Sequence, residues 1–101
     1  MKILIPTTEN SLNGEIDLRF ARAPYFVIYD TEKKTAEIKE NMYRDGARAV
    51  GAMVAQYIIN EGINVVVAAE MGPNVRMILN EAKMEIKKAS GKVKEVLSQF
   101  E

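Results

Sequence analysis

Hydrophobic and polar residues alternate with a changing period along the chain, and each period predicts a type of element. Short apolar runs predict strands at residues 2–6 and 25–29, and alternation predicts a half-exposed strand at 35–41. The run at 64–69 has no polar alternation, which is typical of a strand buried between helices on both faces of a sheet. A short strand, placed at an edge of the sheet, is expected at 84–88.

Three segments carry apolar residues at helical spacing. The first is expected to begin after Asp45, a candidate cap, and to end at Gly62; the second begins at 72–73 and the third at 90–91. The residues expected on the buried faces are, in chain order, Ala47, Val50, Val54, Tyr57 and Ile58; Val75, Ile78, Leu79 and Ala82; and Val93, Val96, Leu97 and Phe100.

The predicted element order is β-β-β-α-β-α-β-α. A turn at 30–34 joins the second and third strands into an antiparallel hairpin, and the helical crossovers before residues 64 and 84 imply parallel strands with right-handed connections. We therefore expect an α/β protein with a mixed five-stranded sheet in a three-layer, ribonuclease H-like fold. The length of 101 residues fits a single domain.

Composition narrows the chemistry. The chain has no Cys and no His, which excludes a thiolate nucleophile, a disulfide, a Cys-ligated cluster and a histidine general base. Its 14 basic and 14 acidic residues cancel, so there is no basic footprint for nucleic acid. No apolar run is long enough to span a bilayer and no signal peptide is seen, so we expect a cytoplasmic protein without a membrane partner.

Ligand sites in open α/β sheets lie beyond the carboxyl ends of the parallel strands. Here that rule indicates the loops at 7–13, 70–74 and 89–91. The candidate binding residues in these loops are Thr7, Thr8, Met71, Gly72, Pro73, Asn74, Ser90 and Gly91. A helix start at 72–74 favours an anion, although a turn that merely begins a helix explains the same residues; at 90–91 a plain helix cap is the alternative.

Two arginines flank an aromatic residue just before the second strand. Arg19 and Arg22 can form bidentate hydrogen bonds to a carboxylate or phosphate and stay charged at physiological pH. The alternative is that Phe20 anchors the loop in the core while the arginines pair with surface acids. The acids within reach are Glu9, Glu15 and Asp17.

A two-metal nuclease of the ribonuclease H kind needs several acids on its strands, and this sequence does not supply them. The first strand has no acid, Asp30 follows the second strand, and only Glu70 stands at a suitable strand end. Among the methionines, Met53, Met77 and Met84 are expected to fill the core, which leaves Met71 as the single one in a candidate site loop. We expect no metal-ligating residues.

Several motifs in order resemble the dinitrogenase iron–molybdenum cofactor biosynthesis family, which includes NifX, NafY and the C-terminal domain of many NifB proteins. The motifs are the residues at 1–6, 20–26, Asn41, 62–69, 71–74 and 89–93. The resemblance covers nearly the whole chain and implies one ribonuclease H-like domain of this family over residues 1–101. Family members bind or carry the iron–molybdenum cofactor or its iron–sulfur precursor, which would make Asn41 a further binding residue.

Two positions depart from the family's usual motif, His-Phe-Gly-Arg. This chain has Arg19-Phe20-Ala21-Arg22, so a histidine ligand is replaced by Arg19 and the glycine by Ala21. The resemblance then implies that an anionic cluster or organic acid is held without Cys or His ligands, by Arg19, Arg22 and the helix start at 72–74.

Three functions remain from the residues and the resemblance. The first is a small non-catalytic binding or carrier protein whose cargo, an iron–molybdenum or iron–sulfur cluster or a small anion, is not identified, with a cofactor-assembly protein as partner. The second is a protein–protein interaction module of the same fold, with a homodimer as one form and no bound cofactor. The third, an enzyme acting on a phosphorylated small molecule, is disfavoured by the missing His, Cys and acid cluster.

Overall fold

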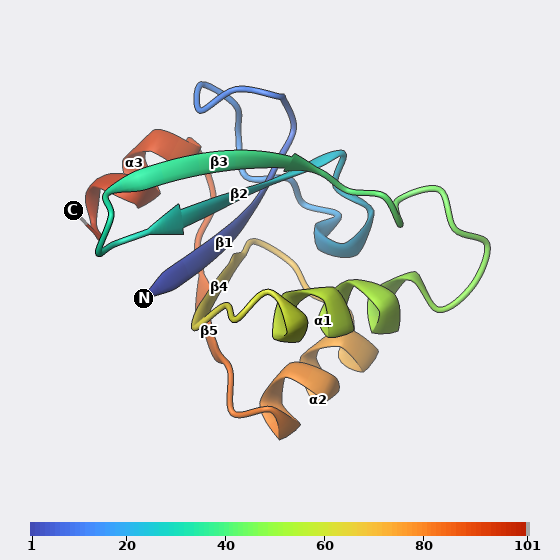
Figure 1. Ribbon diagram of the computed structural model, residues 1–101. Coiled ribbons are helices and arrows are strands. Elements are labelled where there is room, and N and C mark those ends of the chain that lie inside the picture. The colour runs from blue at the N-terminus through green and yellow to red at the C-terminus, as the bar shows by residue number, and fades with distance from the viewer. Residues whose placement is uncertain (101) are drawn as a thin grey trace.

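The computed structural model describes residues 1–100, and its centre is a mixed five-stranded sheet with the strand order β3-β2-β1-β4-β5 (Figure 1). The strands are β1 (Lys2–Thr7), β2 (Tyr25–Asp30), β3 (Thr35–Glu40), β4 (Val65–Ala68) and β5 (Glu85–Lys88). The pairs β1 with β2 and β2 with β3 are antiparallel, whereas β1 with β4 and β4 with β5 are parallel pairs. The predicted hairpin and both predicted parallel crossovers are confirmed.

Helices cover the two faces of this sheet. The helices α1 (Val50–Asn60) and α2 (Pro73–Glu81) lie side by side on one face, and α3 (Val93–Ser98) lies on the other (Figure 1). A short 3₁₀ helix, η1 (Phe20–Arg22), precedes β2 and contacts α1. The three layers and the element order confirm the fold class predicted from the sequence.

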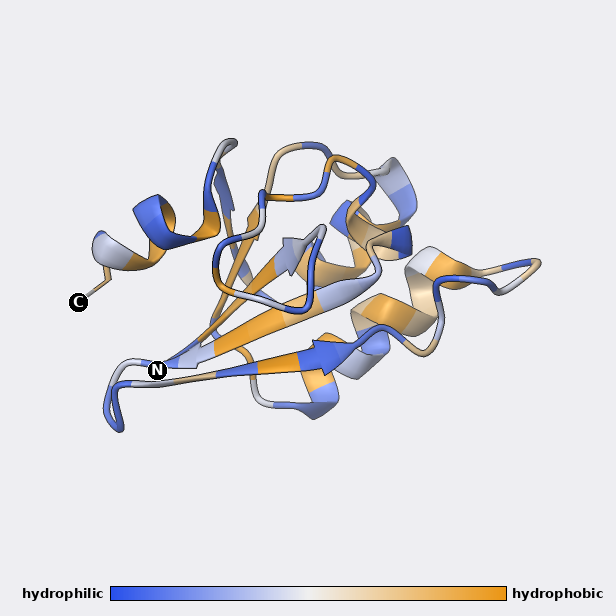
Figure 2. Ribbon diagram, turned by 90° about the horizontal axis from the view of Figure 1, so that it is seen from above, coloured by the Kyte–Doolittle hydropathy of each residue, from blue (hydrophilic) through white to orange (hydrophobic). Residues whose placement is uncertain are grey.

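The pleat of the strands divides the core into two clusters. Leu4, Phe26 and Val66 point towards α1 and α2, while Ile3 and Val27 point towards α3 (Figure 2 shows the apolar residues gathered along the sheet). Every residue of β4 is buried, as expected for a strand between two helical layers. The periodicity of the sequence therefore encodes the sheet directly.

The start of α1 differs from the prediction. Asp45 caps nothing: the helix begins at Val50, its N-cap is Ala49 in the left-handed conformation (φ 55°), and no side chain caps it. Ala47 lies outside the helix and is exposed. The left-handed conformation of Ala49 interrupts any right-handed helix that would start earlier, and Arg22 donates hydrogen bonds to the carbonyls of residues 44 and 46 in the segment before it.

Other expected positions also changed. Helix α2 ends at Glu81, so Ala82 is exposed rather than buried, and Met53 and Met77 are 37% and 55% exposed rather than packed in the core. Ser90 is not a cap, because α3 starts at Val93 with Lys92 as N-cap and no side-chain cap. Ala82 and Ser90 lie outside the helices, whereas Met53 and Met77 lie within α1 and α2 on sides that the core does not cover.

Candidate functional site

A groove of about 550 Å³ lies where η1 and the first turns of α1 and α2 meet. Its lining comes from three separate stretches and two further α2 side chains: residues 19–22, 49–52 and 72–75, with Met77 and Ile78. The third stretch directly follows β4, so the groove lies at the carboxyl end of a parallel strand, where ligands bind in open α/β sheets.

Two helix N-termini open into this groove. Neither α1 nor α2 has a side-chain cap or an acidic residue in its first turn. The first helical hydrogen bonds are donated by the amides of Met53 and Arg76, and the earlier amides of both helices have no partner within residues 1–100. Such amides and the helix dipoles favour an anion.

The helices come close together because Gly51 faces Val75. A Cβ atom added at Gly51 would lie 2.6 Å from the Cγ2 atom of Val75, so the glycine allows the first turns of α1 and α2 to approach each other. At the start of α2, Gly72 and Pro73 give an extended N-cap (φ −66°, ψ 158°) followed by a proline at the first helical position. The start of α2 is therefore determined by neighbouring residues in the sequence, Gly72 and Pro73. Its close approach to α1 depends on Gly51.

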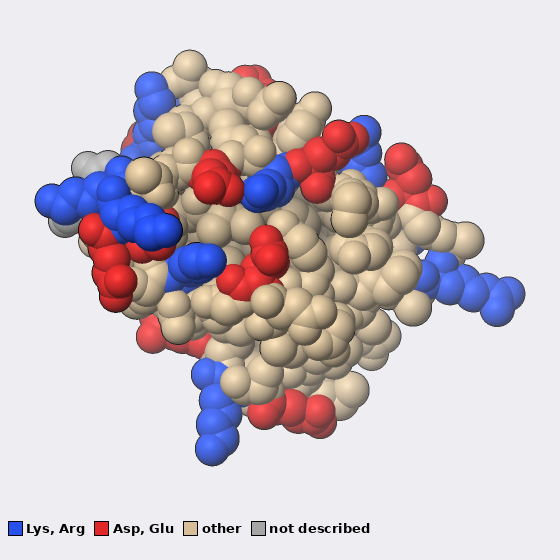
Figure 3. Space-filling model, in the orientation of Figure 1, with Lys and Arg blue, Asp and Glu red and all other residues tan. Residues whose placement is uncertain are grey.

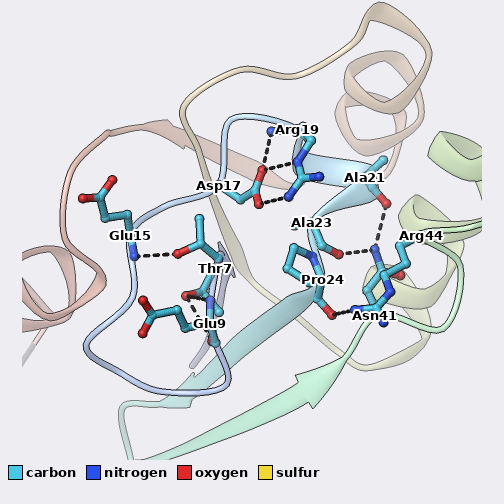
Figure 4. Close-up of polar contacts among 11 residues, drawn as sticks. Thr7, Glu9, Glu15, Asp17, Arg19, Ala21, Ala23, Pro24, Asn41 and Arg44 are labelled. Carbon is cyan, nitrogen blue, oxygen red and sulfur yellow. Dashed lines mark hydrogen bonds and ion pairs between the residues drawn. The ribbon is translucent and has the colours of Figure 1, made fainter.

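Arg19 lies at the rim of the groove and is held by Asp17 (Figure 4). Its Nε and Nη2 atoms donate to the two carboxylate oxygens at 3.0 and 2.7 Å, and its backbone amide donates to Oδ1 at 2.8 Å. Asp17 is only 3% exposed, whereas the Arg19 side chain is 64% exposed. The hydrogen bonds from Arg19 hold the pKa of Asp17 below its usual value.

Of the acids proposed as partners for the arginines, only Asp17 is paired with one in the described part of the chain. Glu15 pairs with Lys92 instead, at 3.6 Å. The Arg19 fork leaves its Nη1 atom without a protein partner among the described residues, so the paired guanidinium still offers donors at the groove.

Arg22 joins η1 to the segment before α1. Its Nη1 atom donates to the carbonyls of Arg44 and Gly46 at 3.0 and 3.1 Å. Arg19, Arg22 and Arg44 also line a second hollow of about 310 Å³, so the first two stand between two adjacent cavities. Arg22 thus shapes one wall of the groove as well as adding charge to it.

Asn41 lies behind η1 rather than in the groove (Figure 4). It is 2% exposed, and its Nδ2 atom donates to the carbonyls of Ala21 and Ala23 at 2.8 and 2.9 Å. Its Oδ1 atom accepts from the amide of Tyr43 at 3.0 Å. The side chain fixes the position of η1, and with it the two arginines.

The predicted site residues do not all come together. Gly72, Pro73, Asn74, Arg19 and Arg22 line the groove; Met71 is half-buried against the core beside it; and Thr7, Thr8, Ser90 and Gly91 lie elsewhere. Thr8 Oγ1 accepts from the amide of Glu15 at 3.1 Å, and the carbonyl of Gly91 accepts from the amide of Ile16 at 2.8 Å. The first contact closes the loop after β1, and the second connects this loop to the segment that leads into α3.

The first turn of α1, residues 49–52, was missing from the prediction. These residues are small and apolar, so their side chains do not indicate a binding site. The sequence also predicts the start of α1 several residues too early, so it does not place residues 49–52 at the helix N-terminus. Exposed Met77, predicted in the core, is a further lining residue. Knowledge of where α1 begins would have been enough to find this part of the site.

The described residues include no side-chain cluster that could bind a metal ion. Within residues 1–100, no three His, Cys, Asp or Glu side chains lie close enough together to do so.

None of the described helices is long and apolar enough to cross a membrane. On the face seen in Figure 3, Lys and Arg are interspersed with Asp and Glu rather than gathered in a basic patch.

Comparison with known proteins assigns the family. The family model described as dinitrogenase iron–molybdenum cofactor matches residues 1–101. This chain belongs to that family. The resemblance inferred from the sequence motifs is thereby confirmed.

Individual relatives agree with this assignment. An uncharacterised protein of Methanocaldococcus jannaschii is 31% identical over 93 residues, which cover 89% of this chain and 75% of that protein. A Thermotoga protein provisionally assigned as NifB is 33% identical, with a TM-score of 0.81, covering 98% of this chain and 85% of that chain. The apo form of the orange protein from Desulfovibrio gigas has a TM-score of 0.88 over 98% of this chain and 85% of its own, and at 24% identity it shows the shared fold alone.

Proposed function

We propose that this protein is a non-catalytic carrier that binds an anionic metallocluster in the groove between η1, α1 and α2. The family description names the iron–molybdenum cofactor, and an iron–sulfur cluster is the related cargo that we expected from the sequence. A carrier hands its cargo to another protein, so a cofactor-assembly protein is the expected partner. The cytoplasm is the location that we expect from the sequence.

One observation carries the proposal: two uncapped, acid-free helix N-termini and two arginines meet in a single groove. Unpaired amides at helix starts hold an anion by hydrogen bonds and by the helix dipole. Guanidinium groups add charge-assisted hydrogen bonds. The groove volume of about 550 Å³ lies within the range of small-molecule sites.

The mode of binding follows from the residues that the sequence lacks. Without Cys or His, this chain cannot supply the thiolate or imidazole ligands that usually fix such clusters. The protein would surround a cluster that keeps its own sulfide or organic ligands and neutralise its charge. Arg19, Arg22 and the amides of residues 50–52, 74 and 75 would make the contacts.

The test is anaerobic mixing of the purified protein with isolated iron–molybdenum cofactor or with a synthetic thiolate-ligated iron–sulfur cluster, followed by gel filtration. We expect colour to elute with the protein. Arg19→Gln combined with Arg22→Gln should lose most of it, because both charges at the groove are removed while hydrogen-bonding amides remain.

The matched control is Lys33→Ala combined with Lys94→Ala. This variant also loses two positive charges, but from exposed positions outside the groove. This variant should keep the colour. If all colour elutes with the free cluster for the wild-type protein, the carrier function is wrong for this chain, and the interaction module becomes the better hypothesis.

A further inference from the structure

Strand β3 forms an open edge of the sheet. It pairs only with β2, and no other element of residues 1–100 lies beyond it (Figure 1). Five of its six residues are exposed, and the sixth, Ile38, is half-buried. An edge of this length presents backbone amides and carbonyls that a further strand can pair with.

The edge carries charged side chains, which can discourage such pairing, but it lacks two other devices that block it, a bulge and a proline. The register between β2 and β3 is unbroken from Tyr25 opposite Glu40 to Asp30 opposite Thr35, so there is no bulge, and β3 contains no proline. On the face towards α1, Thr35, Glu37 and Lys39 line a hollow of about 130 Å³ together with Glu61 at the end of α1. The opposite edge strand, β5, is shorter, with four residues.

The charges of β3 alternate in sign along one face. Glu37 and Lys39 point to the same side of the sheet and form an ion pair of 3.3 Å. Around Ile38 the strand is self-complementary: a second copy running antiparallel, with the two Ile38 residues opposite each other, places each Glu37 opposite a Lys39. Centring the pair on Glu37 or on Lys39 instead puts like charges opposite each other, which is destabilising.

We propose that β3 is a homodimer interface in which two copies pair antiparallel about a twofold axis at Ile38 and join their sheets into one. The four side chains of Glu37 and Lys39 from both copies would form an alternating cluster on one face, and the two Ile38 side chains would contact each other on the other face. The interface is small, so the dimer should be weak and dependent on protein concentration. No residue of β3 lines the groove, so this interface stands independently of the proposed function.

The absence of cysteine allows a clean test of the register, because a single introduced cysteine has no competitor. In Ile38→Cys the two thiols face each other within disulfide range. In Ala36→Cys the two thiols would lie roughly 13 Å apart along the strands, beyond that range. Under mild oxidation we expect Ile38→Cys to form covalent dimers at least about ten times faster, although residue 36 is the more exposed position.

Equal rates for the two cysteine variants, or a faster rate at residue 36, would overturn the proposal. A second measurement avoids the half-buried position. By sedimentation at high protein concentration, Glu37→Lys and Lys39→Glu should each weaken the wild-type dimer, and the double variant should restore it because the opposite charges are exchanged. A monomer at every concentration, or a double variant as weak as the single ones, would contradict the proposed pairing.

Discussion

At the scale of single residues, Asp17 organises the edge of the groove. Its buried carboxylate accepts three hydrogen bonds from one residue, Arg19, through the backbone amide and the guanidinium. This geometry fixes a long and otherwise flexible side chain at the rim of the groove. The sequence offers Asp17 as one of three acids that an arginine could pair with, and the structure shows that Asp17 is the partner of Arg19.

The lowered pKa of Asp17 predicts how stability depends on pH. Because the folded-state pKa lies below the unfolded value, the ionised carboxylate stabilises the fold above about pH 4, and this contribution is lost as the pH falls through the folded-state pKa. Asp17→Asn should therefore lower the free energy of unfolding by about 1–2 kcal/mol at neutral pH, a modest value because Arg19 is exposed to solvent. The difference from wild type should shrink below about pH 4.

Urea denaturation of both proteins across this pH range measures the effect. Asp45→Asn is the control, because the Asp45 side chain is 94% exposed and should change little at any pH. A difference for Asp17→Asn that stays constant down to low pH would show that the charge of Asp17 contributes nothing.

At the scale of elements, the contact between α1 and α2 forms the groove. The two helices start at different points of the chain, and Gly51 lets their first turns come together against Val75. A glycine inside a helix normally costs about 1 kcal/mol relative to alanine, so a close approach is the physical reason to find one here.

Gly51→Ala should accordingly destabilise the fold by about 1–2 kcal/mol despite the better helix propensity of alanine, because the new methyl group meets a buried, β-branched side chain. In a Val75→Ala background the same change should be neutral or stabilising, since the clash is gone. Thermal or urea denaturation of the four proteins in this cycle gives the coupling between the two sites. Additive effects would mean that the helices are not in close contact at Gly51.

At the scale of the whole molecule, charge and composition decide how a cargo is held. The chain has no side chain with an ordinary pKa near neutrality, because it has neither His nor Cys, and its formal net charge is zero. Attraction of an anion then depends on local arginines and helix ends, not on an overall positive field.

Retention of an iron–sulfur cluster should therefore be constant from about pH 6 to pH 8 and should fall as salt rises from about 0.05 to 0.5 M, since exposed guanidinium groups stay charged but are screened. Gel filtration with absorbance detection of the bound cluster measures both dependences, with the free cluster treated in parallel as a control for its own decay. A protein-dependent loss near pH 6.5 would contradict a site built on arginine and backbone amides.

Local periodicity explains why so much of the fold was predictable. The run at 64–69, which has no polar alternation, indicated a strand covered on both sides, and the alternation at 35–41 indicated a half-exposed strand. Strand β4 is fully buried, and five of the six residues of β3 are exposed. The placement of the loops was less predictable. Because α2 packs on one face of the sheet and α3 on the other, the loop after β4 leads to the groove, whereas the loop after β1 meets the start of α3.

The sequence by itself determined the element order, the fold class, the family and the exclusion of Cys and His chemistry, because each of these depends on residue types and on spacing along the chain. Only the tertiary structure decided where α1 begins and which candidates share a cavity. The segment before α1 is bound by Arg22, more than twenty positions away, and the groove joins three stretches from distant parts of the chain. Contacts of that range leave no periodic trace in a sequence, so the structure was needed to find them.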